Sequence, residues 1–205
     1  MSAIAAYRTA ILALLSDATS IIFSSADVDQ ALRWALSEYS LRKPLIRTYD
    51  FTVDYTTGVH ILPADFITRH ITKVEKWNAD LDKILDIPFY AIHPDEQWVI
   101  YTVYEIAAGE ILQISYSTLH QIDGLDAAAG TTVPLADETL LEVGAAGRAA
   151  TMRALDRVET INMNPDVVKA YQNTGAIFIN TFAVSLTAEP GVSVAPLEYP
   201  VNPGF

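Results

Sequence analysis

The chain has 205 residues, of which 51% are hydrophobic and 19% charged, with a formal net charge of −12 and no cysteine. This length fits one domain with an insertion or two small domains. The lack of cysteine excludes disulfides and thiolate metal sites. The negative charge argues against a surface that wraps nucleic acid, because phosphate binding depends on lysine and arginine. The same charge permits an acidic wall past which DNA slides without sticking.

No stretch of the sequence indicates a membrane segment or a secretion signal. No window reaches the length of a transmembrane helix. The opening residues MSAIAAYRTA lack the basic leading region of a signal peptide. We therefore expect no membrane partner.

The N-terminal part predicts two helices. Apolar residues at helical spacing over residues 3–15 predict the first. The second is expected to begin at Asp27, which can cap the helix while Gln30 completes a capping box. It is expected to end before Pro44, because proline cannot continue a helix.

The middle of the chain predicts a small antiparallel β unit. Residues 46–55 alternate apolar and polar side chains, which is typical of a half-buried strand. Residues 59–62 are expected to return as its hairpin partner, and residues 71–77 to form another strand. The clearest predicted hairpin joins residues 98–105 to residues 111–118.

Residues 132–158 predict a long helix built around very small residues. Pro134 can open it, because a first-turn amide has no partner within the helix. The glycines and alanines between its larger residues would let a second helix or a neighbouring subunit approach closely. The alternative is an ordinary buried core helix. The residues expected at the subunit contact are Gly144, Ala145, Gly147, Arg148 and Met152.

The C-terminal part predicts one more helix followed by an extended arm. Asn164 can cap this helix and Pro165 can take its first position, with an end near Leu186. The segment after it contains prolines that prevent helix, yet it is too apolar for a tail that stays in water. We expect the arm to bind a partner. The alternative is a frayed terminus or an arm folded back on its own domain.

No residues of the sequence form a recognisable catalytic motif. The four histidines, His60, His70, His93 and His120, are scattered without metal-ligand spacing. A metal site from His60, His70 and Asp65 is conceivable, although histidines on short strands and loops are more often surface residues. We therefore expect no enzyme, no metal and no cofactor, with a metal-dependent hydrolase as the distant alternative.

These patterns predict an α+β chain that is mainly a helical bundle, with an inserted small antiparallel β domain and an extended C-terminal arm. The helical bundle is expected over residues 1–44 and 132–187, and the β domain over residues 45–121. A linker loop is expected over residues 122–131, and the arm over residues 188–205.

The order of these elements and two phrases resemble the head-to-tail connector (adaptor) proteins of tailed bacteriophages. The phrases are ILPADFI at residues 61–67 and TTVPLADETLLEVGAAGRAATMRAL at residues 131–155. The resemblance implies a structural virion protein that forms a ring, usually dodecameric, beneath the portal protein. Such a ring extends the channel through which DNA passes without specific binding, and it docks the tail or a stopper protein. The implied location is the neck of the virion, and the host cytoplasm during assembly.

The resemblance also implies that the last helix and the arm engage the portal. A capsid decoration protein or a tail-completion protein is the alternative, because either would also be acidic, non-enzymatic and arm-bearing. The arm residues expected to contact the portal are Val192, Val194, Pro196, Leu197, Tyr199 and Phe205.

Overall fold

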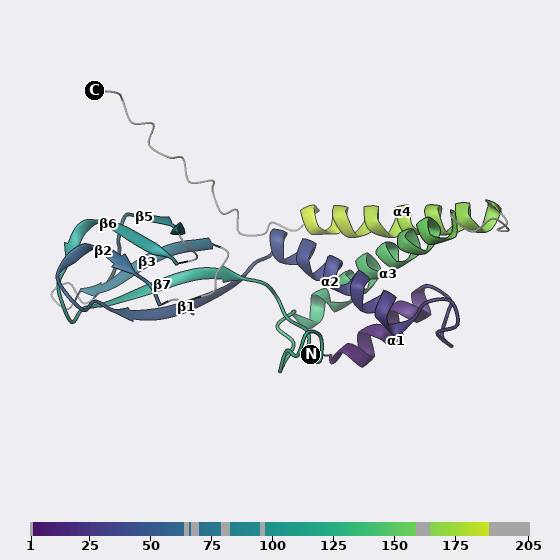
Figure 1. The fold of residues 1–205 in the computed structure, drawn as a ribbon, viewed down its shortest axis with the longest axis horizontal. Coiled ribbons are helices and arrows are strands. Elements are labelled where there is room, and N and C mark those ends of the chain that lie inside the picture. The colour runs from purple at the N-terminus through teal and green to yellow at the C-terminus, as the bar shows by residue number, and fades with distance from the viewer. Residues whose placement is uncertain are drawn as a thin grey trace, which may run out of the picture. The chain divides into compact units, whose positions relative to one another are not determined.

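Four α-helices and seven β-strands make up the described part of the chain (Figure 1). The computed structural model describes residues 2–63, 66, 70–78, 83–94, 97–158 and 165–188. The helices are α1 (Ile4–Leu14), α2 (Ser25–Arg42), α3 (Leu135–Val158) and α4 (Pro165–Ala188). The strands are β1 (Leu45–Thr52), β2 (Thr57–Ile61), β3 (His70–Asn78), β4 (Lys83–Asp86), β5 (Phe89–Ile92), β6 (Val99–Ile106) and β7 (Ile111–Thr118).

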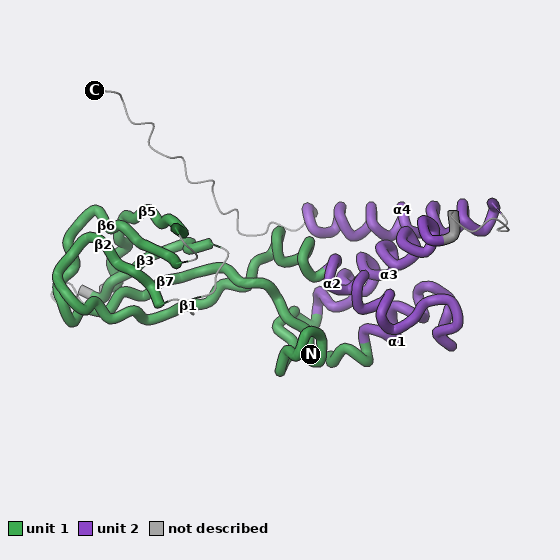
Figure 2. The backbone as a smooth tube through the Cα atoms, viewed as in Figure 1, with its two compact units in different colours: residues 1–6, 36–135 green, residues 7–35, 136–205 purple. Residues whose placement is uncertain are grey.

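The chain divides into two compact units (Figure 2). Unit 1, residues 1–6 and 36–135, contains all the described strands. Unit 2, residues 7–35 and 136–205, contains α4, nearly all of α3 and parts of α1 and α2. The expectation of a mainly helical bundle is therefore wrong, because the fold is mixed and its strands form two antiparallel sheets.

The strands of unit 1 build two sheets around one core. Sheet A is four-stranded, in the order β1-β7-β3-β4, and sheet B is three-stranded, in the order β2-β6-β5. Their buried apolar side chains form a single cluster, so the β region between α2 and α3 has a hydrophobic core of its own. The buried members of this core are Val53, Leu62, Ile71, Val74, Ile87, Ile100, Ile106, Leu112 and Ile114.

Both hairpins predicted from the sequence are wrong in their pairing. The first strand, β1, pairs with β7, whereas β2 pairs with β6. The predicted partners β6 and β7 likewise belong to different sheets. The turn between β6 and β7 instead contacts the residue that follows β1. The Gly109 N–H donates a hydrogen bond to the Val53 carbonyl oxygen at 2.7 Å. Strands that follow one another in sequence usually pair, but here both short connections cross from one sheet to the other.

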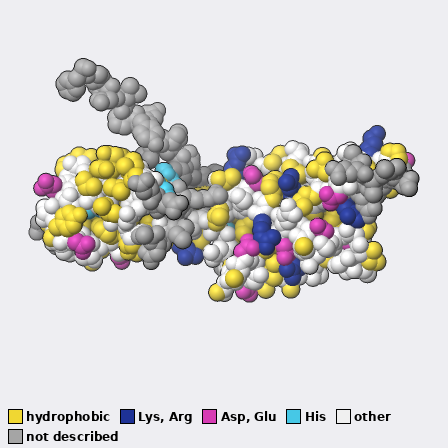
Figure 3. Space-filling view, in the orientation of Figure 1, with side chains coloured by type: hydrophobic (Ala, Val, Ile, Leu, Met, Phe, Trp, Pro, Cys, Tyr) yellow, Lys and Arg dark blue, Asp and Glu magenta, His cyan; other side chains and the backbone are white. Residues whose placement is uncertain are grey.

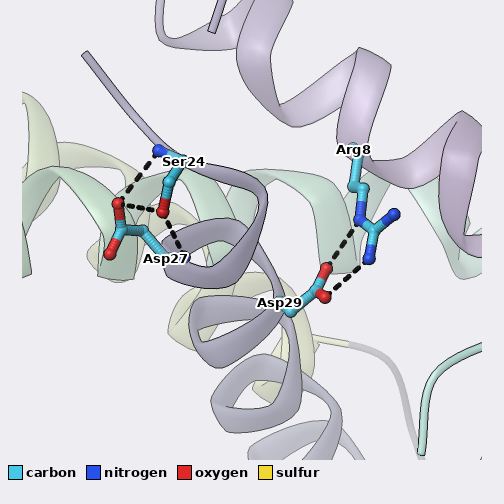
Figure 4. A network of polar contacts seen from close by, with 4 residues as sticks. All are labelled: Arg8, Ser24, Asp27 and Asp29. Carbon is cyan, nitrogen blue, oxygen red and sulfur yellow. Dashed lines mark hydrogen bonds and ion pairs between the residues drawn. The ribbon is translucent and has the colours of Figure 1, made fainter. Parts of the chain in front are cut away.

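Helix α2 begins two residues before the predicted position, because Ser24 and not Asp27 caps it (Figure 4). The Asp27 N–H donates to Ser24 Oγ at 3.2 Å, and the Ser24 N–H donates to Asp27 Oδ2 at 2.9 Å. This reciprocal pair is a capping box. Figure 4 also shows Arg8 of α1 donating to both carboxylate oxygens of Asp29, at 2.8 and 2.6 Å. The two-point ion pair joins α1 to α2.

Helices α3 and α4 cross where their glycines meet. A Cβ atom on Gly147 would lie 2.8 Å from the backbone nitrogen of Ile179. A Cβ atom on Gly175 would lie 3.0 Å from the Gly147 carbonyl oxygen, and one on Gly144 would lie 2.8 Å from the Phe182 ring. These separations are too short for any side chain, so the close approach of the two helices requires glycine.

We predict that Gly175→Ala destabilises unit 2 although it replaces glycine inside a helix. Alanine normally stabilises a helix by about 1 kcal/mol relative to glycine. Here the added methyl group meets Thr151 and the Gly147 carbonyl. We expect the free energy of unfolding to fall by about 1–3 kcal/mol, measured by urea titration. The control is Gly130→Ala, whose Cβ meets nothing within 4 Å. A more stable Gly175→Ala chain would contradict the close crossing.

Asp17 organises the loop between α1 and α2. Its carboxylate accepts backbone N–H groups from Ile21, Ile22 and Phe23 at 3.0, 2.9 and 2.8 Å. The side chain is buried, and these hydrogen bonds, that of Phe23 first, lower the pKa of Asp17. The loop therefore depends on an ionised carboxylate.

The lowered pKa of Asp17 predicts how Asp17→Asn should behave with pH. A carboxylate with a depressed pKa stabilises the fold above its unfolded-state pKa, and this contribution is lost as pH falls through the folded-state pKa. We expect Asp17→Asn to have a lower Tm than the unsubstituted chain at pH 7, and the difference to shrink toward pH 3. Thermal melts monitored by circular dichroism would measure it, with the exposed Asp156→Asn as the control. A difference that stays constant with pH would contradict the role of the charge.

Candidate interaction surfaces

The histidines do not come together as a catalytic or metal site. His60 on β2 is buried, contrary to the expectation of a surface position, and its burial lowers its pKa. Its Nε2 lies 3.3 Å from Thr102 Oγ1. His70 begins β3 in the other sheet, and Asp65 lies outside the described residues. Within the described residues, no three His, Asp or Glu side chains are grouped to hold a metal ion.

His120 is also buried, and its contacts are structural. Its backbone N–H donates to Ser40 Oγ at 3.0 Å. Its ring Nε2 lies 3.0 Å from the Lys43 carbonyl oxygen, and its Nδ1 lies 3.1 Å from the Thr132 carbonyl oxygen. The ring also meets the Tyr39 ring edge-on, with centroids 5.1 Å apart. His120 thus ties the end of α2 to the segment that leads into α3.

A cavity of about 130 Å³ lies beside His60 in unit 1. Phe51, Asp54, Tyr55 and Thr57 are among the residues that line it. The Phe51 ring packs edge-on against His60, at 6.1 Å between ring centroids. The cavity has room for only a few water molecules, so it is no substrate site of ordinary size.

The outer face of sheet B is apolar across all three strands. In the strand register, Val59, Tyr101 and Tyr90 form one row, and Ile61, Val99 and Ile92 form the next. The Tyr90 and Tyr101 rings stack in parallel, with centroids 4.5 Å apart and an interplanar angle of 1°. Most of these side chains are exposed, and Figure 3 shows a broad hydrophobic area on unit 1. The residues of the sheet B face are Val59, Ile61, Tyr90, Ile92, Val99, Tyr101 and Val103.

The outer face of sheet A carries charged and polar side chains among exposed apolar ones such as Trp77, Ile84 and Ile111. Lys73 Nζ lies 2.7 Å from Glu75 Oε1 and 2.9 Å from Asp86 Oδ1. Gln113 Nε2 donates to Asp50 Oδ1 at 3.3 Å. The two outer faces therefore differ in degree: sheet A mixes charged, polar and apolar side chains, whereas the two rows of sheet B are apolar throughout, as suits a protein partner.

The residues expected at a subunit contact make most of their contacts inside unit 2. Gly144 and Gly147 face α4 of the same chain, and Ala145 is buried. The Arg148 guanidinium lies over the Trp34 ring, 5.5 Å from its centre, as in a cation–π pair. Met152 is half-buried. The close approach expected at this stretch is thus made by a second helix of the same chain.

The arm residues expected to bind a partner, Val192 to Phe205, lie outside the described residues. The sheet B face was not foreseen from the sequence, because β5 was not predicted as a strand. The alternation of Val99, Tyr101 and Val103 was the available signal. The pattern could not show which face of β6 packs against the core and which is exposed.

No protein-family model matches this chain, and no curated protein sequence matches it. Among the described helices, none is long and apolar enough to span a membrane.

We predict that the sheet B face binds hydrophobic probes in the isolated protein. Ile61→Thr with Ile92→Thr should lower the fluorescence of 8-anilinonaphthalene-1-sulfonate, because both side chains are exposed on this face. Threonine suits strands, so the free energy of unfolding should change by no more than about 0.5 kcal/mol per site. The matched control is Ile84→Thr with Ile111→Thr, exposed on sheet A. Equal loss of fluorescence in both pairs would contradict the distinction between the faces.

Proposed function

We propose that this chain is a structural virion protein, a head-to-tail adaptor that forms a ring under the portal protein. The ring extends the DNA channel and docks the tail or a stopper protein, and it carries out no catalytic step. It acts in the neck of the virion after assembly in the host cytoplasm. Two kinds of observation support the proposal. Residues 61–67 and 131–155 resemble head-to-tail adaptor proteins, and the folded chain exposes an apolar face.

The observation that carries the proposal is the sheet B face. Apolar side chains from three adjacent strands form two rows on this face. Such a face is expected where another protein packs, because burying exposed apolar surface contributes roughly 25 cal/mol per Å². We assign this face to the tail-side partner, and the arm to the portal.

The acidic charge of −12 also supports the proposal. A channel wall must let DNA pass without holding it, and negative side chains repel phosphates within about one Debye length, roughly 8 Å at physiological salt. A nucleic-acid-binding role would need a basic surface instead.

Immunogold labelling of purified virus particles with antibody against this chain tests the proposal. Label confined to the neck between head and tail is the expected result. Label over the whole head would replace the adaptor with a decoration protein. Absence of label from the particle would overturn the structural role and reopen the search for an activity.

We predict that a chain ending at Leu186 folds but no longer attaches to the portal. Most of the removed residues lie beyond α4, so the described core is unchanged apart from the last residues of that helix. Pull-down with purified portal protein measures attachment, and circular dichroism checks the fold. The control is the full chain with Ile84→Thr and Ile111→Thr, which keeps the arm. Unimpaired attachment of the shortened chain would sink the assignment of the arm.

A further inference from the structure

Most of helix α4 carries no charge although much of it faces water. Residues 170–188 contain no Asp, Glu, Lys, Arg or His, whereas charged residues make up 19% of the chain. The only charged residues of α4, Asp166 and Lys169, lie in its first two turns. A solvent-exposed helix face is normally rich in charged side chains, so this one has the character of a buried surface.

The inward and outward faces of α4 separate cleanly. Gly175, Phe182 and Leu186 are buried against the rest of unit 2. Ile177 and Val184 are 63% and 56% exposed, and they lie seven residues apart on the opposite side. Their neighbours at three- and four-residue steps are exposed as well, which gives one continuous stripe along the helix. The residues of this α4 stripe are Ala170, Asn173, Ile177, Asn180, Val184 and Thr187.

We infer that the α4 stripe packs against a second copy of this chain. The inference rests on the proposed ring and names the surface that each subunit contributes to it. Each copy has a net charge of −12, so two copies repel one another wherever acidic side chains face each other. A contact between copies is least opposed where a surface has no acidic side chain, and the α4 stripe meets this condition.

The chemistry of the α4 stripe also suits a copy of the same chain. Ile177 and Val184 supply apolar side chains, and alanines 176 and 183 beside them are exposed and small enough for close helix approach. Asn173 and Asn180 each offer both hydrogen-bond donors and acceptors, so they can pair with a polar surface of either kind. A basic partner would instead be drawn to the acidic surface elsewhere on the chain.

Sedimentation velocity of the full chain over a concentration series tests the inference. We expect the unsubstituted chain to self-associate, and the association to strengthen with added salt because salt screens the repulsion between copies. Ile177→Glu with Val184→Glu should weaken the association at least tenfold, because each glutamate would be buried at the contact without a partner. Thermal melts check that both exposed substitutions leave the fold intact.

The matched control is Leu155→Glu, compared with Ile177→Glu alone, because it places a single glutamate on α3 at a side chain of similar exposure, 61% against 63%. Ile177→Val should retain the association. An unsubstituted chain that stays monomeric up to about 100 µM would overturn the inference, as would equal weakening by Leu155→Glu and Ile177→Glu alone. Neck labelling of particles judges the adaptor role separately, so a failure of the α4 stripe is distinct from a failure of the proposed function.

Discussion

Unit 2 depends on the contact between Gly147 on α3 and Gly175 on α4. At this point the two backbones are so close that neither position has room for a methyl group. Around it, Gly144 receives the Phe182 ring, and Phe182 in turn packs near Trp34 of α2, with ring centroids 6.1 Å apart. Burying the Phe182 ring against Gly144 gives dense packing at this point of α3. Because one side of α4 is fixed in this way, its opposite side is left for other contacts.

The two units place their apolar surface differently. In unit 1 the inner faces of both sheets share a core, and further apolar side chains cover the outer face of sheet B. In unit 2 the helices bury their large side chains, and the outward stripe of α4 is neutral rather than strongly apolar. A flat apolar face and a neutral helical stripe suit different kinds of neighbour.

Local sequence patterns predicted the helices and strands better than they predicted which strands pair. The start of α4 at Pro165 was predicted, because the preference of proline for the first helical turn is local. The cap of α2 was misplaced by three residues, since Ser24 and Asp27 satisfy the same pattern as Asp27 and Gln30. Strand pairing could not be predicted, because β1 meets β7 across more than fifty intervening residues. The burial of His60 and His120 likewise depends on contacts that are distant in sequence, such as Thr102 and Lys43.

The two edges of sheet B limit how a neighbour can use its face. Strand β2 carries a bulge between Thr57 and Val59, and the four-residue β5 follows Pro88 directly. A bulged edge and a short edge beside a proline are poor templates for adding another strand. A partner must therefore lie across the side chains instead of extending the sheet through backbone hydrogen bonds. A partner would then recognise the shape of the Tyr90–Tyr101 stack and its aliphatic neighbours. The same two edges disfavour strand-to-strand polymerisation of this chain, even at high local concentration.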